Sequence, residues 1–391
     1  MNEQSRSVRY ENTRLADYTA DDSIDRGHVD IPFAMLALLL LAIGVVMVLS
    51  SSYARAYYDV EGITHHNATY YFVRQALFAM CGVGVMLVCS RLPMGFYRRV
   101  SFIVFIISIA LLVLVAFIGA VGGGAQRWID LGFTTFQPSE LTKVGVVLYF
   151  ALLICQKKDD IRTMRGLVPF VGWLGLIAVL LALEPHMSAL VIIGTLGLVM
   201  LFVGGAALRL FIFGGIGAAG AAGLAYALFP YVRQRLTAWT DPFADVAGSG
   251  WQVVQSLYSI GSGGLLGLGL GNSRQKYLYL PEEHNDYIFS IVCEELGFIG
   301  AILILALFAL LIIRGYWLAM HARDRYSCLV CVGITTLFAL QVILNVAVCT
   351  NTIPSTGISL PLFSYGGTAL LLQMGEIGIV LSMSRDIPEK R

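Results

Sequence analysis

Long runs of apolar residues separated by short polar stretches run along most of the chain. A membrane-spanning helix needs about 20 mainly apolar residues, and ten segments approach or exceed this length. They are residues 31–53, 72–90, 100–121, 139–155, 167–183, 187–204, 207–229, 287–313, 327–349 and 361–383. This pattern predicts an all-α integral membrane protein with about ten transmembrane helices. We expect residues 31–384 to form a single polytopic membrane domain.

The polar interruptions of this pattern are unequal in length. The longest, residues 230–286, separates the seventh and eighth predicted helices. Three shorter ones, residues 122–140, 184–186 and 350–367, are rich in Gly, Pro, Ser and Thr or contain a helix-breaking proline. Non-helical backbone at membrane depth is tolerated only where it lines a cavity or packs in protein. If all four face one compartment, they predict a polar cavity there.

Charged residues determine the expected orientation. Hydrophobic residues make up 57% of the chain and charged residues 13%, against about 25% charged in soluble domains. Lys and Arg are concentrated in the loops on the side of the N-terminus, which by the positive-inside rule is cytoplasmic. We therefore expect cytoplasmic tails at residues 1–30 and 385–391, and an extracytoplasmic loop at 230–286. The net charge of +1, without a basic cluster, excludes a nucleic-acid partner.

Cysteine and histidine contribute no candidate metal site. The seven cysteines lie in or beside apolar segments, which is typical of small buried hydrophobic residues. The six histidines are scattered, without the spacing that metal ligands require.

The stretch RQKYLYLPEEHNDYIFSIVCEELG, residues 274–297, brings several ionisable groups to the start of the eighth predicted helix. An ionised side chain costs roughly 2.5–3.5 kcal/mol at the centre of a spanning helix, whereas at the helix mouth it stays hydrated. Asp286 is therefore the first candidate for a catalytic residue. The alternative is that Asp286 only caps this helix, because aspartate is a favoured N-cap.

Polar residues inside the predicted helices are few. Glu140 and Lys143 are three residues apart, so they share one helical face and can pair, either as a structural ion pair or facing a substrate. Glu294 and Glu295 lie about 12–14 Å deeper than Asp286 at 1.5 Å per residue. They need partners that the sequence does not identify.

Several long motifs occur together and in one order. They are AQRWIDLG, FQPSELTK, GWQVVQSLYSIGSGGLLGLGLGNSRQKYLYLPEEHNDYIFSIVCEELGFIG and PSTGISLPLFSYGGT. In these motifs the chain resembles the SEDS family of bacterial membrane proteins, which includes FtsW, RodA and SpoVE, and is more similar to the division and sporulation branch. It departs from the family where His186 replaces a commonly acidic residue, and the role of His186 stays open. Asn285-Asp286 keeps the aspartate of the usual Thr-Asp pair.

The resemblance implies a peptidoglycan glycosyltransferase. Such enzymes polymerise lipid II, a disaccharide-pentapeptide on undecaprenyl pyrophosphate, at the outer face of the bacterial cytoplasmic membrane. They work with a class B penicillin-binding protein, a transpeptidase that crosslinks the product. Asp286 matches the family's essential aspartate, and Glu140 and Lys143 match its conserved polar pair.

The chemistry of this reaction assigns roles to these residues. Asp286 would act as general base on the acceptor sugar hydroxyl, and cations would meet the departing pyrophosphate. Glu140 and Ser364 are also candidates for substrate binding, although Ser364 could instead only shape its turn. The candidate cations, with Lys143 first, are Lys143, Arg127, Arg235, Arg274 and Lys276. A divalent metal ion at Asp286 stays open as a cofactor, because no second ligand is evident.

Two hypotheses from other classes compete with this one. A flippase for a lipid-linked precursor would suit ten helices around a polar cavity, but it needs polar residues that continue toward the cytoplasmic side. A scaffold that only positions the penicillin-binding protein would leave Asp286 dispensable. The sequence does not distinguish a division, sporulation or elongation setting.

Overall fold

The fold is a bundle of long helices. The computed structural model describes residues 27–60, 62–122, 125–132, 134–184, 186–228 and 230–387. The long helices are α2 (Ile31–Tyr57), α3 (Tyr70–Arg91), α4 (Met94–Ile118), α5 (Pro138–Lys157), α6 (Met164–Leu183), α7 (Met187–Val203), α8 (Leu208–Leu228), α11 (Ile288–Met320), α12 (Arg325–Cys349) and α13 (Gly367–Ser384). Each predicted segment lies on one of them. Within the described residues, all of them except α7 and α8 are long and apolar enough to cross a membrane, and α7 is a shorter apolar helix. The predicted helical, multi-pass membrane fold is confirmed.

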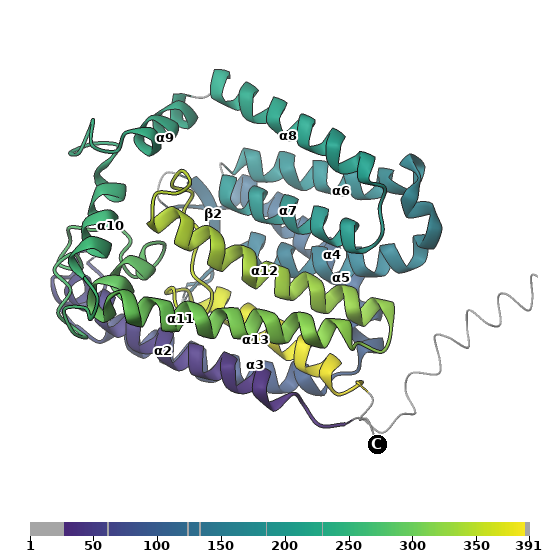
Figure 1. Ribbon diagram of the computed structural model, residues 1–391, viewed down its shortest axis with the longest axis horizontal. Coiled ribbons are helices and arrows are strands. Elements are labelled where there is room, and N and C mark those ends of the chain that lie inside the picture. The colour runs from purple at the N-terminus through teal and green to yellow at the C-terminus, as the bar shows by residue number, and fades with distance from the viewer. Residues whose placement is uncertain are drawn as a thin grey trace, which may run out of the picture.

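The helices run roughly alongside one another, with α8 at one margin of the bundle (Figure 1). Helices α5, α12 and α13 are largely buried, whereas α3, α4 and α6 expose most of their apolar side chains. Lipid tails are as apolar as leucine, so exposed apolar faces carry no penalty in a membrane. The bundle therefore has a protein core surrounded by a lipid-facing shell.

Irregular and short elements gather at one end of the bundle, on the left in Figure 1, which we call the loop end. They include α9 (Pro230–Thr240), α10 (Trp251–Ser262), the strands β1 (Ala120–Gly122), β2 (Ala125–Asp130) and β3 (Thr135–Phe136), and residues 350–366. The strands form an antiparallel sheet in the order β1-β2-β3. The sequence indicated a glycine-rich, non-helical segment there, and the structure shows that its AQRWID part pairs as a strand with both neighbouring segments.

A glycine contact interrupts α11 at Gly297, nine residues after the helix begins. Gly297 has φ 68°, and a Cβ there would lie 2.2 Å from the amide nitrogen of Gly267. Phe298 N donates to the carbonyl of Gly264, and Leu268 N donates to that of Glu294. The loop after α10 thus inserts its backbone against α11 and replaces hydrogen bonds that the helix loses at the kink.

Glu295 of α11 finds its partner in the 271–276 loop. Its carboxylate is fully buried and lies 3.0 Å from Lys276 Nζ. Ser50 of α2 also donates to it, at 2.7 Å, and Lys276 Nζ donates to the carbonyl of Gly271 at 2.6 Å. This buried network ties α2, α11 and the loop together.

Glu294, also fully buried, binds the same loop through hydroxyl and backbone donors. Its carboxylate accepts from Ser273 Oγ at 2.5 Å and from Arg274 N at 2.9 Å. Ser259 Oγ of α10 donates to it at 3.0 Å. A carboxylate that accepts several such bonds stays satisfied without a cation. The conformation of the loop is therefore fixed by two neighbouring glutamates.

We predict that Lys276→Met lowers the free energy of unfolding by about 3–5 kcal/mol, because it leaves Glu295 charged, buried and unpaired. Denaturation of the detergent-solubilised protein measures the change. The double variant Lys276→Met/Glu295→Leu removes both charges and should recover most of the loss.

Arg274→Met is the matched control. This neighbouring side chain is exposed, so its removal should change the free energy of unfolding by less than about 0.5 kcal/mol. Equal effects of the two single variants would contradict a stabilising role of the buried pair.

Candidate active site

The turn that carries Asp286 is held by its backbone. Asn345 Nδ2 of α12 donates to the carbonyl of Asp286 at 2.8 Å and to that of Ile358 at 2.7 Å. Tyr365 N donates to the carbonyl of His284 at 2.9 Å. One amide inside a membrane helix therefore joins the Asp286 turn to the 350–366 loop. The sequence signal for Asn345 was a polar residue within an apolar helix.

Ser364 contributes to this turn rather than to an open cavity. Its hydroxyl donates to the carbonyl of Asn285 at 2.8 Å and accepts from Leu360 N at 2.7 Å. The side chain is 8% exposed. These contacts support the turn-shaping alternative for Ser364, because its hydroxyl proton is already engaged by the protein.

A second support of the turn was not predicted. Arg55 of α2 forms a bidentate pair with the buried Glu283, with Nε–Oε1 2.9 Å and Nη2–Oε2 3.0 Å. The rings of His284, Tyr71 and Tyr365 contact one another, with centroid distances from His284 of 5.0 Å to Tyr71 and 5.7 Å to Tyr365. The sequence offered no signal for these contacts, because α2 and α3 are far from this turn in the chain.

The carboxylate of Asp286 is half-buried and closely approached by a glycine. A Cβ on Gly357 would lie 3.0 Å from Oδ2, and Gly357 has φ 68°, which favours glycine. The first residue before α11 is Tyr287, and no side-chain cap hydrogen bond is made there. Asp286 therefore does not cap the helix, and its carboxylate faces the 350–366 loop.

The pKa of Asp286 is raised to about 6, chiefly by burial and then by the negative charge of Glu282. Arg127 of β2 and Arg235 of α9 oppose this rise because their positive charges favour the ionised carboxylate. Arg235 Nη1 donates to the carbonyl of Ser355, which fixes α9 over the loop. The structure thus brings two of the predicted cations to the predicted catalytic residue.

Arg127 also links Asp286 to the turn between α6 and α7. Burial raises the pKa of Glu184 to about 7, and Arg127 opposes this rise. The pKa of His186 is lowered to about 3, chiefly by burial and then by the positive charges of Arg127 and Lys143. His186 is therefore neutral at pH 7. The predicted reversal at 184–186 joins this charged cluster, with residue 185 outside the described residues.

Lys143 and Glu140 form the predicted pair, with Nζ–Oε1 2.7 Å. The lysine is 3% exposed and the glutamate 13%. Glu376 of α13 lies within electrostatic range of both, and one of its carboxylate oxygens is buried without a hydrogen-bond partner. The pair therefore lies deeper in the protein, on the side of the cluster that contains His186.

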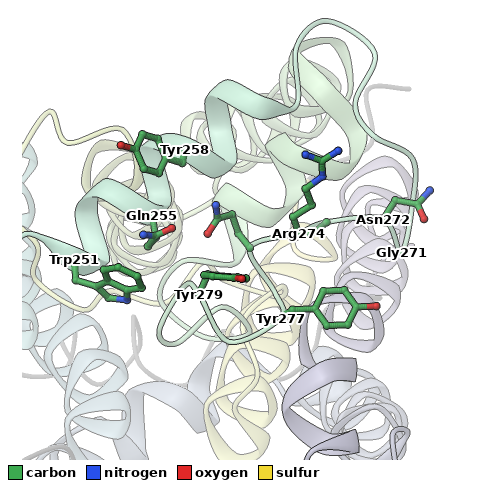
Figure 2. Close-up of a pocket in the computed structure, with 10 residues that line it drawn as sticks. Trp251, Gln255, Tyr258, Gly271, Asn272, Arg274, Tyr277 and Tyr279 are labelled. Carbon is green, nitrogen blue, oxygen red and sulfur yellow. The ribbon is translucent and has the colours of Figure 1, made fainter. Parts of the chain in front are cut away.

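The other two predicted cations lie elsewhere. Lys276 is paired with Glu295, as described above, so its charge is already neutralised. Arg274 lines a separate open pocket of about 740 Å³, which Tyr277 and Gln255 also line (Figure 2). The two side chains separate because Arg274 and Lys276 point in different directions from the 273–276 loop. Their spacing in the sequence does not reveal this difference.

The donor set around Asp286 is a poor fit for a metal ion. Among the described residues, no group of three or more His, Cys, Asp or Glu side chains is arranged to hold a metal ion. Around Asp286 the neighbouring charges that lower its pKa are arginines, which do not ligate metals. The part of the chain that the structure describes therefore forms no protein-built metal site at Asp286.

These features define a multi-pass membrane protein with one partly buried carboxylate among cations at the loop end of a helical bundle. The family model of FtsW, RodA and SpoVE, described as "Cell cycle protein", matches residues 31–388. The chain belongs to this family.

Comparisons with individual proteins agree with this family assignment. Stage V sporulation protein E of Bacillus subtilis (strain 168) is 40% identical over 361 residues, which cover 91% of this chain and 97% of that protein. A "Probable peptidoglycan glycosyltransferase FtsW" of Trichlorobacter lovleyi is 37% identical, over 91% of this chain and 93% of that protein.

Solved structures share the fold. A chain in the structure described as "Structural coordination of polymerization and crosslinking by a peptidoglycan synthase complex" has a TM-score of 0.77 at 27% identity, covering 93% of this chain and 99% of that one. The rod shape determining protein RodA of Thermus thermophilus has a TM-score of 0.68 at 24% identity, covering 93% of this chain and 98% of that one.

We predict that Arg127→Gln raises the pKa of Asp286 further above about 6, because it removes a positive charge that favours the carboxylate. Titration of carboxyl signals by carbon NMR measures this pKa, and Asp286→Asn identifies the signal. Arg274→Gln removes an equal charge at the separate pocket and should leave the value unchanged. A lower pKa in Arg127→Gln would refute the electrostatic link.

Proposed function

We propose that this protein is a peptidoglycan glycosyltransferase that polymerises lipid II at the outer face of the bacterial cytoplasmic membrane. The observation that carries the proposal is the half-buried carboxylate of Asp286, with Arg127 and Arg235 close enough to act on its charge. The names of the FtsW relatives support the reaction class. The tails at residues 1–30 and 385–391 would then be cytoplasmic, and the loop end would face outward.

Asp286 acts as the general base in this proposal. Its carboxylate takes the proton of the acceptor sugar hydroxyl, whose oxygen then attacks the anomeric carbon of the donor sugar. The bond from that carbon to the pyrophosphate oxygen breaks, and undecaprenyl pyrophosphate leaves with the electron pair. A pKa near 6 keeps most of the carboxylate ionised at pH 7 while leaving it basic enough to accept a proton.

The departing pyrophosphate needs positive charge nearby. Arg127, Arg235 and Lys143 are the cations that act on the cluster around Asp286. Their fixed positions in a partly dry site make their charges more effective than in water. Lys276 is excluded from this role because Glu295 neutralises it, and Arg274 because it lines the other pocket.

A class B penicillin-binding protein is the proposed partner. The support is the structural similarity to a chain of a peptidoglycan synthase complex. The flippase alternative requires charged residues that continue through the bundle. Near the opposite end of the bundle, the charged groups Asp30, Arg314, Arg98 and Asp324 are instead paired with one another.

We predict that Asp286→Asn lowers the rate of lipid II polymerisation by about 10²–10⁴-fold, because the amide cannot accept the proton. Activity of the wild type should fall as the pH drops through about 6, where Asp286 becomes protonated. The assay uses purified protein with its partner and lipid II, and measures glycan strands on gels.

Asp241→Asn is the matched control, since Asp241 is an exposed aspartate of the same 230–286 segment. It should retain wild-type activity. Full polymerisation by Asp286→Asn would exclude this aspartate as the base and favour the scaffold alternative.

We predict that Lys143→Met weakens use of the donor lipid and lowers the rate by about 10²–10³-fold, as expected for a lost charge at a developing anion. Lys157→Met, at the far end of the same helix, should behave like the wild type. A melting temperature measured in parallel separates loss of folding from loss of catalysis. Unchanged donor use in a folded Lys143→Met would assign Lys143 a purely structural role.

A further inference from the structure

The pocket beside Arg274 is a built feature of the fold. One wall is a single stripe of α10, formed by Trp251, Gln255 and Tyr258, which are spaced i, i+4 and i+7. Tyr277 and Tyr279 of the following loop also line the pocket. In Figure 2, Trp251, Gln255 and Tyr279 gather toward one side of the pocket, and Tyr277 lies toward the other.

Both the helix and the loop are held rigidly. Ser256 Oγ, on the other face of α10, lies 2.7 Å from Ser290 Oγ and donates to the carbonyl of Cys349 at 2.7 Å. The loop is fixed by Glu294, which accepts from Ser273 Oγ and Arg274 N. The pocket is therefore preformed, as ligand sites usually are. Its volume of about 740 Å³ is within the range of small-molecule sites.

Two side-chain amides line this pocket, those of Gln255 and Gln275. Gln255 is 6% exposed. Gln275 Oε1 is buried, and within the described part of the chain it has no hydrogen-bond partner. An unsatisfied buried polar group costs about 1–3 kcal/mol. The unpartnered acceptor of Gln275 therefore points to a polar ligand.

The aromatic side chains define the rest of that ligand. Tyr258, Tyr277 and Tyr279 are 50%, 46% and 54% exposed, so their rings are available for contact. Tyrosine and tryptophan offer an apolar face and a polar edge, which matches a pyranose ring with its apolar C–H face and its hydroxyl rim. Arg274 adds one exposed positive charge, suited to a carboxylate.

From these contacts we infer that the pocket binds a carbohydrate, namely an N-acetylated amino-sugar strand of the kind that the proposed reaction produces. Amides bind its acetamido and hydroxyl groups, the tyrosines stack on its rings, and Arg274 meets a carboxylate attached to the strand. The inference rests on the proposed function. Helix α10, which forms one wall, contacts α11 through Ser256 and Ser290, and Ser290 is four residues after Asp286. The pocket therefore adjoins the catalytic turn without overlapping it.

The test measures binding apart from catalysis. The probe is a β-1,4-linked N-acetylglucosamine tetramer, added to the full-length protein in detergent and followed by calorimetry. We expect binding to the wild type and equally to Asp286→Asn. Gln255→Leu and Tyr279→Ala should each weaken binding at least tenfold. Tyr279 is half exposed, so Tyr279→Ala keeps the test valid if Gln255→Leu fails to fold.

Tyr58→Ala is the matched control, because Tyr58 directly follows α2, is 54% exposed and is not among the residues that line the pocket. It should bind the tetramer like the wild type. Absence of binding to the wild type, or equal binding by both pocket variants, overturns the inference. The inference is also overturned if the pocket variants lose binding to the penicillin-binding protein but keep sugar binding, because the pocket would then be a protein contact. Failure of the proposed function appears separately, as full polymerisation by Asp286→Asn.

Discussion

A charge placed among membrane helices must bring its own partner, because lipid supplies none. Glu294 and Glu295 meet this constraint by binding the loop that follows α10. That loop in turn leads to the turn of Asp286. The geometry of the loop end therefore depends on two carboxylates that take no part in the proposed chemistry. Their hydrogen-bonded carboxylates act as anchors, and the kink at Gly297 gives the loop room to reach them.

The environment of Asp286 differs from that of these glutamates in one respect. Glu294 and Glu295 have their oxygens satisfied by close donors, whereas Asp286 faces Gly357 and is reached by arginines through their charge. Its backbone is fixed by Asn345 and its side chain remains available. A positioned backbone with an uncommitted carboxylate is what a general base needs.

The family's usual acidic residue at position 186 is a histidine in this chain, and the structure gives that change a physical meaning. His186 is buried and neutral near Arg127 and Lys143, so it does not offset their charge. Glu184 beside it has a pKa near 7. The cluster around Asp286 is therefore more cationic than one with an acidic residue at this position, which would suit the anionic pyrophosphate of the proposed reaction.

The sequence by itself determined the helices, the family and the candidate base. Apolar runs must become helices in lipid because every backbone group has to be satisfied internally, and Asp286 was identified by its position at a helix mouth. Which cations approach it was decided only by the tertiary structure. The sequence did not distinguish among Arg127, Arg235, Arg274 and Lys276. In the structure, the pairing of β2 places Arg127 near the Asp286 turn, and Glu295 neutralises Lys276. Such contacts join residues far apart in the chain, so the local sequence pattern does not predict them.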